Sequence, residues 1–441
     1  MPPITKELQL VVLLTGASGF IGSHLAKAIA AAGHRVICAV RKPGAHHDPR
    51  FGYIAADFTR DFDSSAWLPR LADVDVVINA VGIIRETGQQ SFDAIHVRGP
   101  VALFKAAADS KVKLVVQISA LGADQHAQSR YHLSKKQADD FLASLDLPSV
   151  IVQPSLVYGP GGTSARLFTT LASLPLIALP GTGTQKVQPV YIDDVVAAIL
   201  ALLDKVARFD IQKGTRIALV GPEPLSLRDF LSTLRTAMRM GRPRCIPMPM
   251  PLVRLGARLA NLLPGSLLDP ETLQMLERGN TGSASAMTSL LGHAPRAVRD
   301  FVAPGNVANT RLHAKLNWLL PMLRVGIALV WIVTGIVSMG LYPVADSYAL
   351  LERVGISGIL LPLMLYGAAL MDFVFGVATL MMKRRRWLWL AQIVVILFYT
   401  AIITWRLPEF WLHPYGPLLK NLPMLAAIWL LLELEPELKE R

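Results

Sequence analysis

Three residues in the first third of the chain have the types and spacing needed for hydride chemistry on a hydroxyl or carbonyl group. Tyr131 and Lys135 are four positions apart, so a helix would place them on one face. Ser119 ends an apolar run twelve positions before Tyr131. We expect the charge of Lys135 to lower the pKa of Tyr131, which would act as general acid or base while Ser119 orients the substrate oxygen. The alternative is a surface Tyr–Lys pair without a catalytic role.

A glycine-rich turn precedes these residues. Residues 15–22 read TGASGFIG and join an apolar run to a helical pattern. Gly16 permits a tight turn, Gly19 lets a pyrophosphate approach the backbone, and Gly22 allows a helix and a strand to pack closely. Free N–H groups at the start of the helix would bind the phosphates. The cofactor would contact this turn through Gly16, Ser18, Gly19, Phe20, Ile21 and Gly22. The alternative is a tight turn without a ligand.

The residues after the second apolar run bear on the choice of cofactor. An NAD site usually carries an acidic residue there, but this sequence has Arg41 and Lys42. Two cations can pair with a 2′-phosphate, so we predict NADP, with NAD as the alternative. Both could instead be solvated loop charges. Asp57, after the next apolar run (53–56), could bind the adenine amino group or cap a turn.

The apolar runs that must position these residues alternate with helical patterns. They are residues 8–15, 35–40, 74–79, 114–119 and 149–153. Such alternation predicts an α/β fold with a Rossmann-type, doubly wound parallel sheet. The nucleotide-binding part would lie mainly in residues 1–160 and a smaller lobe mainly in 160–300. Within that lobe, the apolar segments 246–252 and 255–263 could line a pocket, but we expect them to be core.

The chain changes character near residue 318. It is 52% apolar and only 17% charged overall, and its last part consists of long apolar runs. We predict a linker at 306–317 and a four-helix transmembrane bundle in residues 318–435. Its spans would be 318–341, 354–382, 387–406 and 417–434. Asp372 and Arg324 fall inside spans, and we expect them to form a structural pair, with a proton relay as the alternative.

The charges around these spans predict a topology. The basic run at 383–386 separates the second and third spans, and such loops are retained in the cytoplasm. The N-terminus does not resemble a signal peptide. The expected protein is therefore an integral, multi-pass protein, in a bacterial inner membrane, with its N-terminal domain and C-terminus in the cytoplasm.

The net charge of +12 fits a chain resting on an anionic bilayer. The basic residues are scattered and no nucleic-acid module is visible, so we expect no nucleic-acid partner. Cys38 and Cys245 are far apart and lack metal-ligand spacing, so we expect no metal site.

Residues 1–305 resemble an extended, epimerase-like short-chain dehydrogenase/reductase. The resemblance rests on the glycine turn, the Asn79–Gly82 stretch, Ser119, the Tyr131/Lys135 pair, and residues 154–160 and 190–195. The stretch after Ser119 most resembles the atypical branch that contains the complex I 39 kDa subunit. The resemblance implies that Ala80, Val81, Gly82, Pro154 and Ser155 contact the cofactor and that Lys135 holds its ribose. One departure is His96, where many members have a proton-relaying asparagine.

Residues 318–435 resemble the DoxX-like four-helix membrane family. The cues include Trp331 and the run from His413 to Pro423. Taken together, the two resemblances imply a membrane-anchored NAD(P)-dependent oxidoreductase or epimerase/dehydratase. Its expected partners are a lipophilic hydroxyl or carbonyl substrate and the bilayer, with a membrane redox complex or a homo-oligomer as further partners. The alternative is a non-catalytic NADPH-binding subunit that senses nucleotide or assists assembly.

Overall fold

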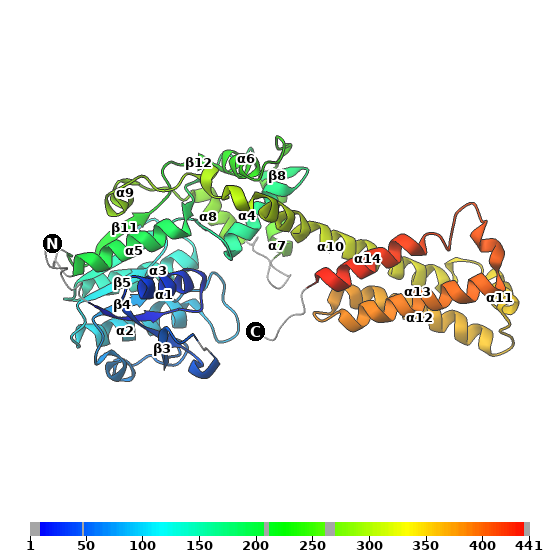
Figure 1. The fold of residues 1–441 in the computed structure, drawn as a ribbon, viewed down its shortest axis with the longest axis horizontal. Helices are drawn as coiled ribbons and strands as arrows, with labels where there is room; N and C mark the ends of the chain where they lie inside the picture. Colours follow the sequence, from blue (N-terminus) through cyan, green and yellow to red (C-terminus); the bar gives the residue numbers. More distant parts are fainter. Residues whose placement is uncertain (1–8, 46–47, 207–210, 261–269, 436–441) are drawn as a thin grey trace, which may run out of the picture. The chain divides into compact units, whose positions relative to one another are not determined.

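A computed structural model describes residues 9–45, 48–206, 211–260 and 270–435 of the chain (Figure 1). These residues belong to two units, which meet between Ala314 and Lys315. The first unit contains the sheet and the predicted site, and the second contains the long apolar helices.

Seven strands form the sheet of the first unit in the order β11-β6-β5-β4-β1-β2-β3, and all their pairings are parallel. Their bounds are β1 (Val11–Thr15), β2 (Arg35–Val40), β3 (Phe51–Ala55), β4 (Val76–Asn79), β5 (Leu114–Ile118), β6 (Ser149–Pro154) and β11 (Thr215–Leu219). The order reverses between β1 and β4, which is where open α/β sheets bind ligands. The Rossmann-type sheet is therefore confirmed, with β11 as an additional edge strand that the sequence patterns did not reveal.

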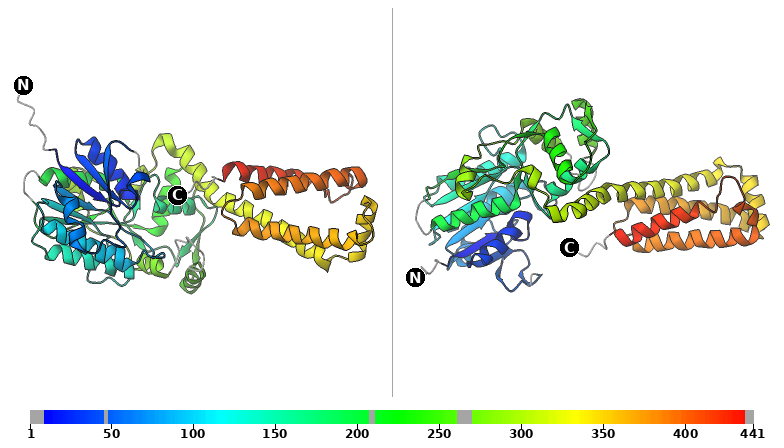
Figure 2. Two further views of the ribbon diagram at one scale, coloured as in Figure 1. Left: turned by 90° about the horizontal axis from the view of Figure 1, so that it is seen from below. Right: turned by 45° about the horizontal axis from the view of Figure 1, so that its top comes forward.

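Helices cover both faces of this sheet (Figure 2). On one face, α1 (Phe20–Ala31) and α5 (Ile192–Val206) pack in a core cluster that includes Leu14. On the other, α2 (Gly99–Ala108) and α3 (Arg130–Ser144) pack in a cluster that includes Leu13. Neighbouring residues of β1 thus face opposite layers, as the alternation of a strand requires.

The remaining elements of the first unit form the smaller lobe and its connections. Three two-stranded pairs, β7–β10, β9–β12 and β8–β13, join helices of this part. The strands are β7 (Val157–Tyr158), β8 (Ile177–Pro180), β9 (Lys186–Val187), β10 (Val190–Tyr191), β12 (Leu225–Ser226) and β13 (Cys245–Met248). The helices are α4 (Thr163–Ser173), α6 (Leu227–Ala237), α7 (Met250–Ala260), α8 (Pro270–Arg278) and α9 (Ser285–Leu291).

The expectation that segments 246–252 and 255–263 belong to the core is wrong for their described isoleucine and leucine side chains. Ile246, Leu252, Leu255 and Leu259 are between 46% and 58% exposed. Only one side of α7, with Val253 and Ala257, packs against α8. Residues 261–263 lie outside the described part of the chain.

The second unit consists of α10 (Val307–Ile336), α11 (Val344–Val354), α12 (Leu360–Met381), α13 (Arg386–Arg406) and α14 (Asn421–Leu434). The first turns of α10, up to Ala314, belong to the first unit. Three helical segments of the described chain are long and apolar enough to cross a membrane: 304–341, 360–381 and 386–406. The segment expected to be a linker, 306–317, is instead helical from Val307. The expected fourth span is a helix of 14 residues, shorter than the about 20 that a perpendicular span needs.

Buried polar contacts connect the helices of the second unit. The indole N–H of Trp331 donates to Gln392 Oε1 at 3.0 Å, and Gln392 Nε2 donates to Thr379 Oγ1 at 2.8 Å. Arg324 Nε donates to Glu435 Oε1 at 2.8 Å. The expected partner of Arg324 was Asp372, but the arginine reaches the end of α14 instead, where a carboxylate is available at the helix terminus.

Candidate active site

The glycine turn has the shape that a pyrophosphate site needs. Gly16 has a φ of +69°, and a Cβ there would lie 2.6 Å from the carbonyl carbon of Ala80. A Cβ on Gly22 would lie 2.2 Å from the Gly16 carbonyl oxygen. The helix α1 then begins after Gly19, which provides no side-chain cap. The free N–H groups of this first turn can therefore receive an anion. The other predicted contacts of the turn, Ser18, Phe20 and Ile21, are at least partly exposed.

The end of β2 carries the two cations expected at the adenosine ribose. Arg41 and Lys42 follow β2 directly and are exposed. Asp57 accepts hydrogen bonds from the backbone N–H of Thr59 at 2.9 Å and from its hydroxyl at 2.7 Å. Burial raises the pKa of Asp57, but these bonds and the charges of Arg41 and Arg60 outweigh it and lower the pKa overall. Asp57 thus caps a turn, which was the alternative to binding the adenine amino group.

The catalytic helix α3 begins beside the carboxyl end of β5. Ser129 caps it by accepting a hydrogen bond from the backbone N–H of His132 at 3.2 Å, which places Tyr131 in the first turn. One turn later, Lys135 Nζ donates to the carbonyl oxygens of Val81 and Ile118, each at 3.2 Å. Lys135 therefore joins the loop after β4 to the end of β5, immediately before Ser119.

The loop after β4 is close to the lysine ammonium group. A Cβ on Gly82 would lie 2.9 Å from Lys135 Nζ and 3.5 Å from His96 Nε2. Only a glycine leaves this space free, and Gly82 is itself exposed. The predicted cofactor contacts at Ala80, Val81 and Gly82 thus lie between the glycine turn and the catalytic helix.

A buried carboxyl group lies one further turn along α3. Asp139 has no solvent exposure, and its Oδ2 accepts a hydrogen bond from the Ser119 hydroxyl. Its Oδ1 has no hydrogen-bond partner among the described residues. Burial raises the pKa of Asp139 to about 6, against the lowering effects of Ser119 and Lys135. Burial likewise lowers the pKa of Lys135 to about 8, although Asp139 opposes this.

The pKa of Tyr131 does not follow the expectation. Burial and then the negative charge of Asp139 raise it to about 12. The expected lowering of this pKa by Lys135 is therefore wrong, and the lysine ammonium group donates to the carbonyl oxygens of Val81 and Ile118. At neutral pH Tyr131 is therefore protonated, which suits a proton donor.

His96 packs against the tyrosine from a π-helical turn, Asp93–Arg98, that precedes α2. Its ring centroid lies 5.5 Å from that of Tyr131. Nε2 accepts from the backbone N–H of Ile83 at 3.0 Å, so Nδ1 carries the proton and donates to Ser134 Oγ at 2.9 Å. Burial, and then the charge of Lys135, lower the pKa of His96 to about 2. His96 is therefore a neutral residue that connects the Gly82 loop to α3.

A row of buried polar side chains crosses the sheet near the carboxyl ends of β1, β4 and β5. Thr15 Oγ1 donates to Asn79 Oδ1 at 2.6 Å, and Asn79 Nδ2 donates to Gln117 Oε1 at 2.7 Å. Register pairs Thr15 with Asn79 and Asn79 with Gln117 across β1, β4 and β5. Gln117 also favours the ionised form of Asp139. This row connects the start of the glycine turn to Gln117 on β5.

The two predicted nicotinamide contacts at the end of β6 have structural partners. The Ser155 hydroxyl donates to the carbonyl oxygen of Gln188, and the Pro154 carbonyl accepts from the backbone N–H of Leu121 at 2.9 Å. Both residues are buried. The structure therefore places them beside the loop that follows Ser119, with the Ser155 hydroxyl already paired.

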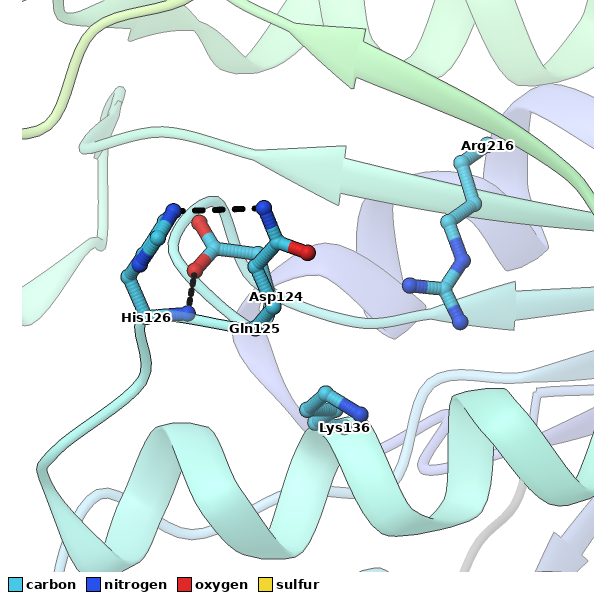
Figure 3. A pocket seen from close by; sticks show the side chains of 5 residues that line it. All are labelled: Asp124, Gln125, His126, Lys136 and Arg216. Atoms are coloured by element: carbon cyan, nitrogen blue, oxygen red, sulfur yellow. Dashed lines mark hydrogen bonds between the residues drawn. The ribbon is translucent and has the colours of Figure 1, made fainter.

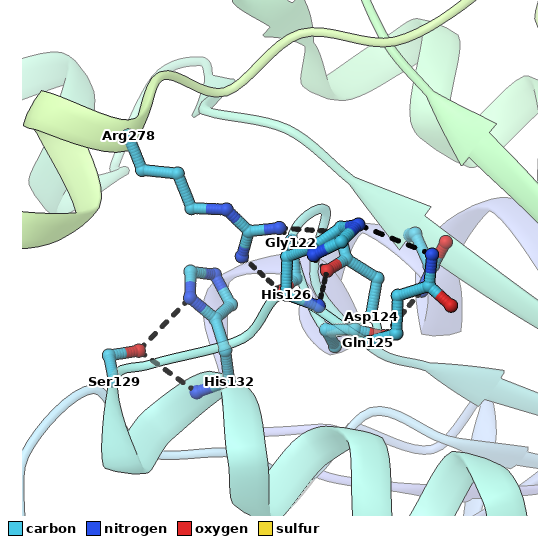
Figure 4. Close-up of polar contacts among 9 residues, drawn as sticks. Gly122, Asp124, Gln125, His126, Ser129, His132 and Arg278 are labelled. Atoms are coloured by element: carbon cyan, nitrogen blue, oxygen red, sulfur yellow. Dashed lines mark hydrogen bonds and ion pairs between the residues drawn. The ribbon is translucent and has the colours of Figure 1, made fainter.

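The smaller lobe reaches this loop through α8. Arg278 donates to the Gly122 carbonyl at 2.7 Å and to both carboxylate oxygens of Asp124 (Figure 4). From the same helix, Glu271 accepts a hydrogen bond from the backbone N–H of Tyr131 at 2.9 Å. The lobe thus positions both the loop after β5 and the start of α3.

The loop after β5 also lines a pocket of about 450 Å³ (Figure 3). Its lining residues are Asp124, Gln125, His126, Lys136 and Arg216. The cations Lys136 and Arg216 both pair with Asp140. Ser119, Tyr131 and Lys135 are not among its lining residues.

Sequence reasoning missed Asp139 and Gln117. Asp139 had a recognisable signal, because it follows Tyr131 and Lys135 at the same four-residue spacing on α3. Gln117 had a weaker one, a polar residue within an otherwise apolar strand. Its role depends on the register of β4 and β5, which a single sequence does not reveal.

Comparisons with known proteins agree with this geometry. Residues 12–218 match the NAD dependent epimerase/dehydratase family, and residues 328–429 match the DoxX-like family. The chain is 30% identical over 201 residues to a ceramide reductase of Caulobacter vibrioides, covering 45% of this chain and 62% of the relative. The chain therefore spans less than two thirds of that relative's length.

Two further similar proteins align with this chain over a larger share of their length. The chain is 28% identical over 284 residues to NADH dehydrogenase (ubiquinone) 1 alpha subcomplex subunit 9 of Arabidopsis thaliana, covering 60% of this chain and 68% of the relative. A nucleoside-diphosphate-sugar epimerase from Staphylococcus aureus has the same fold with a TM-score of 0.55 at 16% identity, covering 66% of this chain and 99% of that structure. The chain therefore combines an NAD dependent epimerase/dehydratase family domain in residues 12–218 with a DoxX-like family domain in residues 328–429.

Proposed function

We propose that this protein is a membrane-anchored NAD(P)-dependent oxidoreductase or epimerase/dehydratase that acts on a lipophilic hydroxyl or carbonyl substrate. The observation that carries the proposal is the hydrogen bond from Lys135, on α3, to the carbonyl oxygen of Ile118, the residue before Ser119. Tyr131 lies one turn before Lys135 on the same helix, and only β4 separates β5 from the strand-order switch where the glycine turn lies.

The residues around the glycine turn fit a dinucleotide. The first turn of α1, which has no side-chain cap, would receive the pyrophosphate, and the Gly82 loop would lie along the nicotinamide half beside Lys135. Arg41 and Lys42 would pair with a 2′-phosphate, which favours NADP over NAD. When bound, the cofactor supplies or accepts a hydride.

The proton chemistry falls to this chain's own side chains. Tyr131, protonated at neutral pH, would donate its phenolic proton to a carbonyl oxygen as that oxygen becomes a hydroxyl. Lys135, whose ammonium group lies at the Val81 and Ile118 carbonyl oxygens, would hold the ribose of the cofactor. Ser119 directs its own proton to Asp139, so its lone pairs are free to accept a hydrogen bond from a substrate hydroxyl.

Two observations support a membrane-derived substrate. Three helices of the described chain are long and apolar enough to cross a bilayer, which would hold the first unit at the lipid surface. The Caulobacter relative is called a ceramide reductase, which supports reduction of a lipid carbonyl group. A lipid ketone or alcohol is therefore the substrate class that we favour.

The topology of this proposal has four spans, with α14 as the fourth and with the first unit and the C-terminus in the cytoplasm of a bacterial cell. The basic run at 383–386 supports it, because such loops are retained in the cytoplasm. A reporter fused to the C-terminus should be active only in the cytoplasm, and activity outside it would contradict four spans.

The test of the proposed reaction is cofactor oxidation by the full-length protein in detergent. NADPH and NADH would each be supplied with a total membrane lipid extract, and the change in cofactor fluorescence would be followed. Lipid-dependent oxidation supports the proposal. Tight cofactor binding without oxidation, over several lipid extracts, contradicts it.

A second function is favoured by one observation. His96 is neutral and fully hydrogen-bonded, which leaves it without a free proton to relay. The similarity to the Arabidopsis NADH dehydrogenase subunit supports a nucleotide-binding role within a membrane redox complex or another assembly. In that case Tyr131→Phe would change neither cofactor affinity nor any measured activity.

A further inference from the structure

An exposed apolar and basic surface lies on the smaller lobe. It is formed by Leu176, by β13 with its flanking residues, and by the outer side of α7, which is labelled in Figure 1. We call residues 176 and 242–259 the lobe surface.

The apolar part of the lobe surface follows helical spacing. Leu252, Leu255 and Leu259 are 57%, 52% and 58% exposed and lie on one side of α7. Val253 and Ala257, on the opposite side, are buried against α8. Helix α7 is thus folded against the lobe by one face while its leucines remain uncovered.

The apolar patch continues beyond the helix. Ile246 on β13 is 46% exposed and Leu176 is 48% exposed. They are neighbours because β13 pairs with β8, and the Ile177 backbone N–H donates to the Arg244 carbonyl at 2.8 Å. A patch of this kind on a protein normally marks a contact with a membrane or a partner.

The charge of the lobe surface selects the membrane. Residues 242–260 contain four arginines and no aspartate or glutamate. Arg242, Arg244, Arg254 and Arg258 are all exposed, and only Arg254 has an ion-pair partner, Glu277, among the described residues. A helix that presents leucines and arginines together is typical of segments that lie in the interface of an anionic bilayer.

The lobe surface is also close to the point where the chain enters its long apolar segment. Ser173 at the end of α4 donates a hydrogen bond to the carbonyl oxygen of Ala314, the last residue of the first unit, at 3.1 Å. Strand β8 begins four residues after Ser173 and pairs with β13. Ala314 lies in α10, which continues into the first candidate span.

We propose that the lobe surface is a second, interfacial contact of the protein with an anionic lipid leaflet, in addition to its spans. The exposed leucines would enter the acyl boundary, and the arginines would pair with lipid phosphates. Each arginine near an anionic surface favours the bound state about fivefold. The contact would place the smaller lobe where a lipid can leave the bilayer, but it does not depend on catalysis.

The experiment places a nitroxide at Leu255→Cys in full-length protein in lipid nanodiscs of phosphatidylethanolamine and phosphatidylglycerol. Cys245→Ser removes the half-buried native thiol. The Cys245→Ser protein without an added cysteine measures how much label reacts at the buried Cys38. Lys27→Cys, on the exposed side of α1, is the matched control. Collision with oxygen reports lipid, and collision with a nickel chelate reports water.

We expect the Leu255 label to collide with oxygen several-fold more readily than with the nickel chelate, and the Lys27 label to show the reverse. Changing Arg242, Arg244 and Arg258 together to glutamine should lower the oxygen preference at Leu255 without altering Lys27. Nickel access at Leu255 equal to that at Lys27 would overturn the proposal, as would an arginine variant with unchanged oxygen preference. Shielding from both reagents, with spin–spin broadening, would overturn it in favour of a second copy of the chain.

Discussion

Ser119 donates its hydroxyl proton to Asp139, a carboxyl group without solvent exposure one turn beyond Lys135 on the same helix. This bond determines what Ser119 can do for a substrate. While Asp139 is ionised, Ser119 can only accept a hydrogen bond from the substrate. When Asp139 is protonated it can donate to Ser119, whose own proton then becomes free for a carbonyl oxygen. Asp139 is thus a positioning residue, because it acts through Ser119.

Asp139→Asn tests this relationship through the pH dependence of carbonyl reduction. The pKa of Asp139 is raised to about 6 by burial, so the parent protein should reduce its substrate faster as the pH falls through about 6. The amide of the variant can donate to Ser119 at every pH, and its rate should be flat in this range. The measurement is kcat against pH with a saturating substrate.

Asp140→Asn is the matched control, since Asp140 is exposed and pairs with Lys136 and Arg216. It should keep the parent profile. An identical acid limb in the parent and in Asp139→Asn would show that Asp139 does not set the proton of Ser119.

His96→Gln tests the assignment of His96 as a neutral positioning residue. Its pKa is lowered from 6.5 to about 2, so folding disfavours its protonation. The stability from this group is complete above 6.5 and is lost as the pH falls below it, by about 2 kcal/mol at pH 5. Thermal unfolding in detergent should therefore be less sensitive to acid in His96→Gln than in the parent.

Part of the acid sensitivity should persist in that variant, because burial and then the charge of Arg278 lower the pKa of His132 to about 4. Equal loss of unfolding temperature between pH 7.5 and pH 5 in both proteins would contradict the assignment of His96.

Arg41→Ala combined with Lys42→Ala tests the cofactor preference. A charge-assisted hydrogen bond to a phosphate contributes about 1.5–3 kcal/mol, so NADPH affinity should fall at least about tenfold while NADH affinity changes little. The measurement is titration of cofactor fluorescence with the full-length protein. A tenfold preference of the parent for NADH would refute the NADP prediction.

The Trp331–Gln392 bond offers a test in the second unit. Gln392→Leu leaves the indole N–H of Trp331 without its acceptor and should lower the unfolding temperature modestly, since such membrane bonds contribute about 0.6 kcal/mol on average. Adding Trp331→Phe removes the unpaired donor. The double variant should be destabilised by less than the sum of the single variants, and strict additivity would count against the bond.

The sequence predicted the elements whose patterns are local. The apolar strand runs, the TGASGFIG turn and the four-residue spacing of Tyr131 and Lys135 each depend on neighbouring residues, and the sheet confirmed the fold class. Edge strand β11 was not predicted, because Thr215–Leu219 contains Arg216 and lies more than sixty residues from its partner strand β6.

Features that depend on tertiary contacts could not be predicted. The raised pKa of Tyr131 follows from its burial and from Asp139, and the direction of Lys135 follows from two carbonyl groups on different strands. Similarly, the leucines of α7 have the same pattern as a buried helix, and only the fold shows that they are exposed.

The most direct test of the account is a comparison of Tyr131→Phe with the parent protein in lipid-dependent NADPH oxidation. Removing one general acid typically costs 10²–10⁴-fold in rate. We predict a loss of about that size in the variant, with NADPH affinity and unfolding temperature unchanged, because the Tyr131 backbone N–H still bonds to Glu271. Equal oxidation rates in the two proteins, with cofactor bound in both, would contradict the assignment of Tyr131 and with it the proposed reaction.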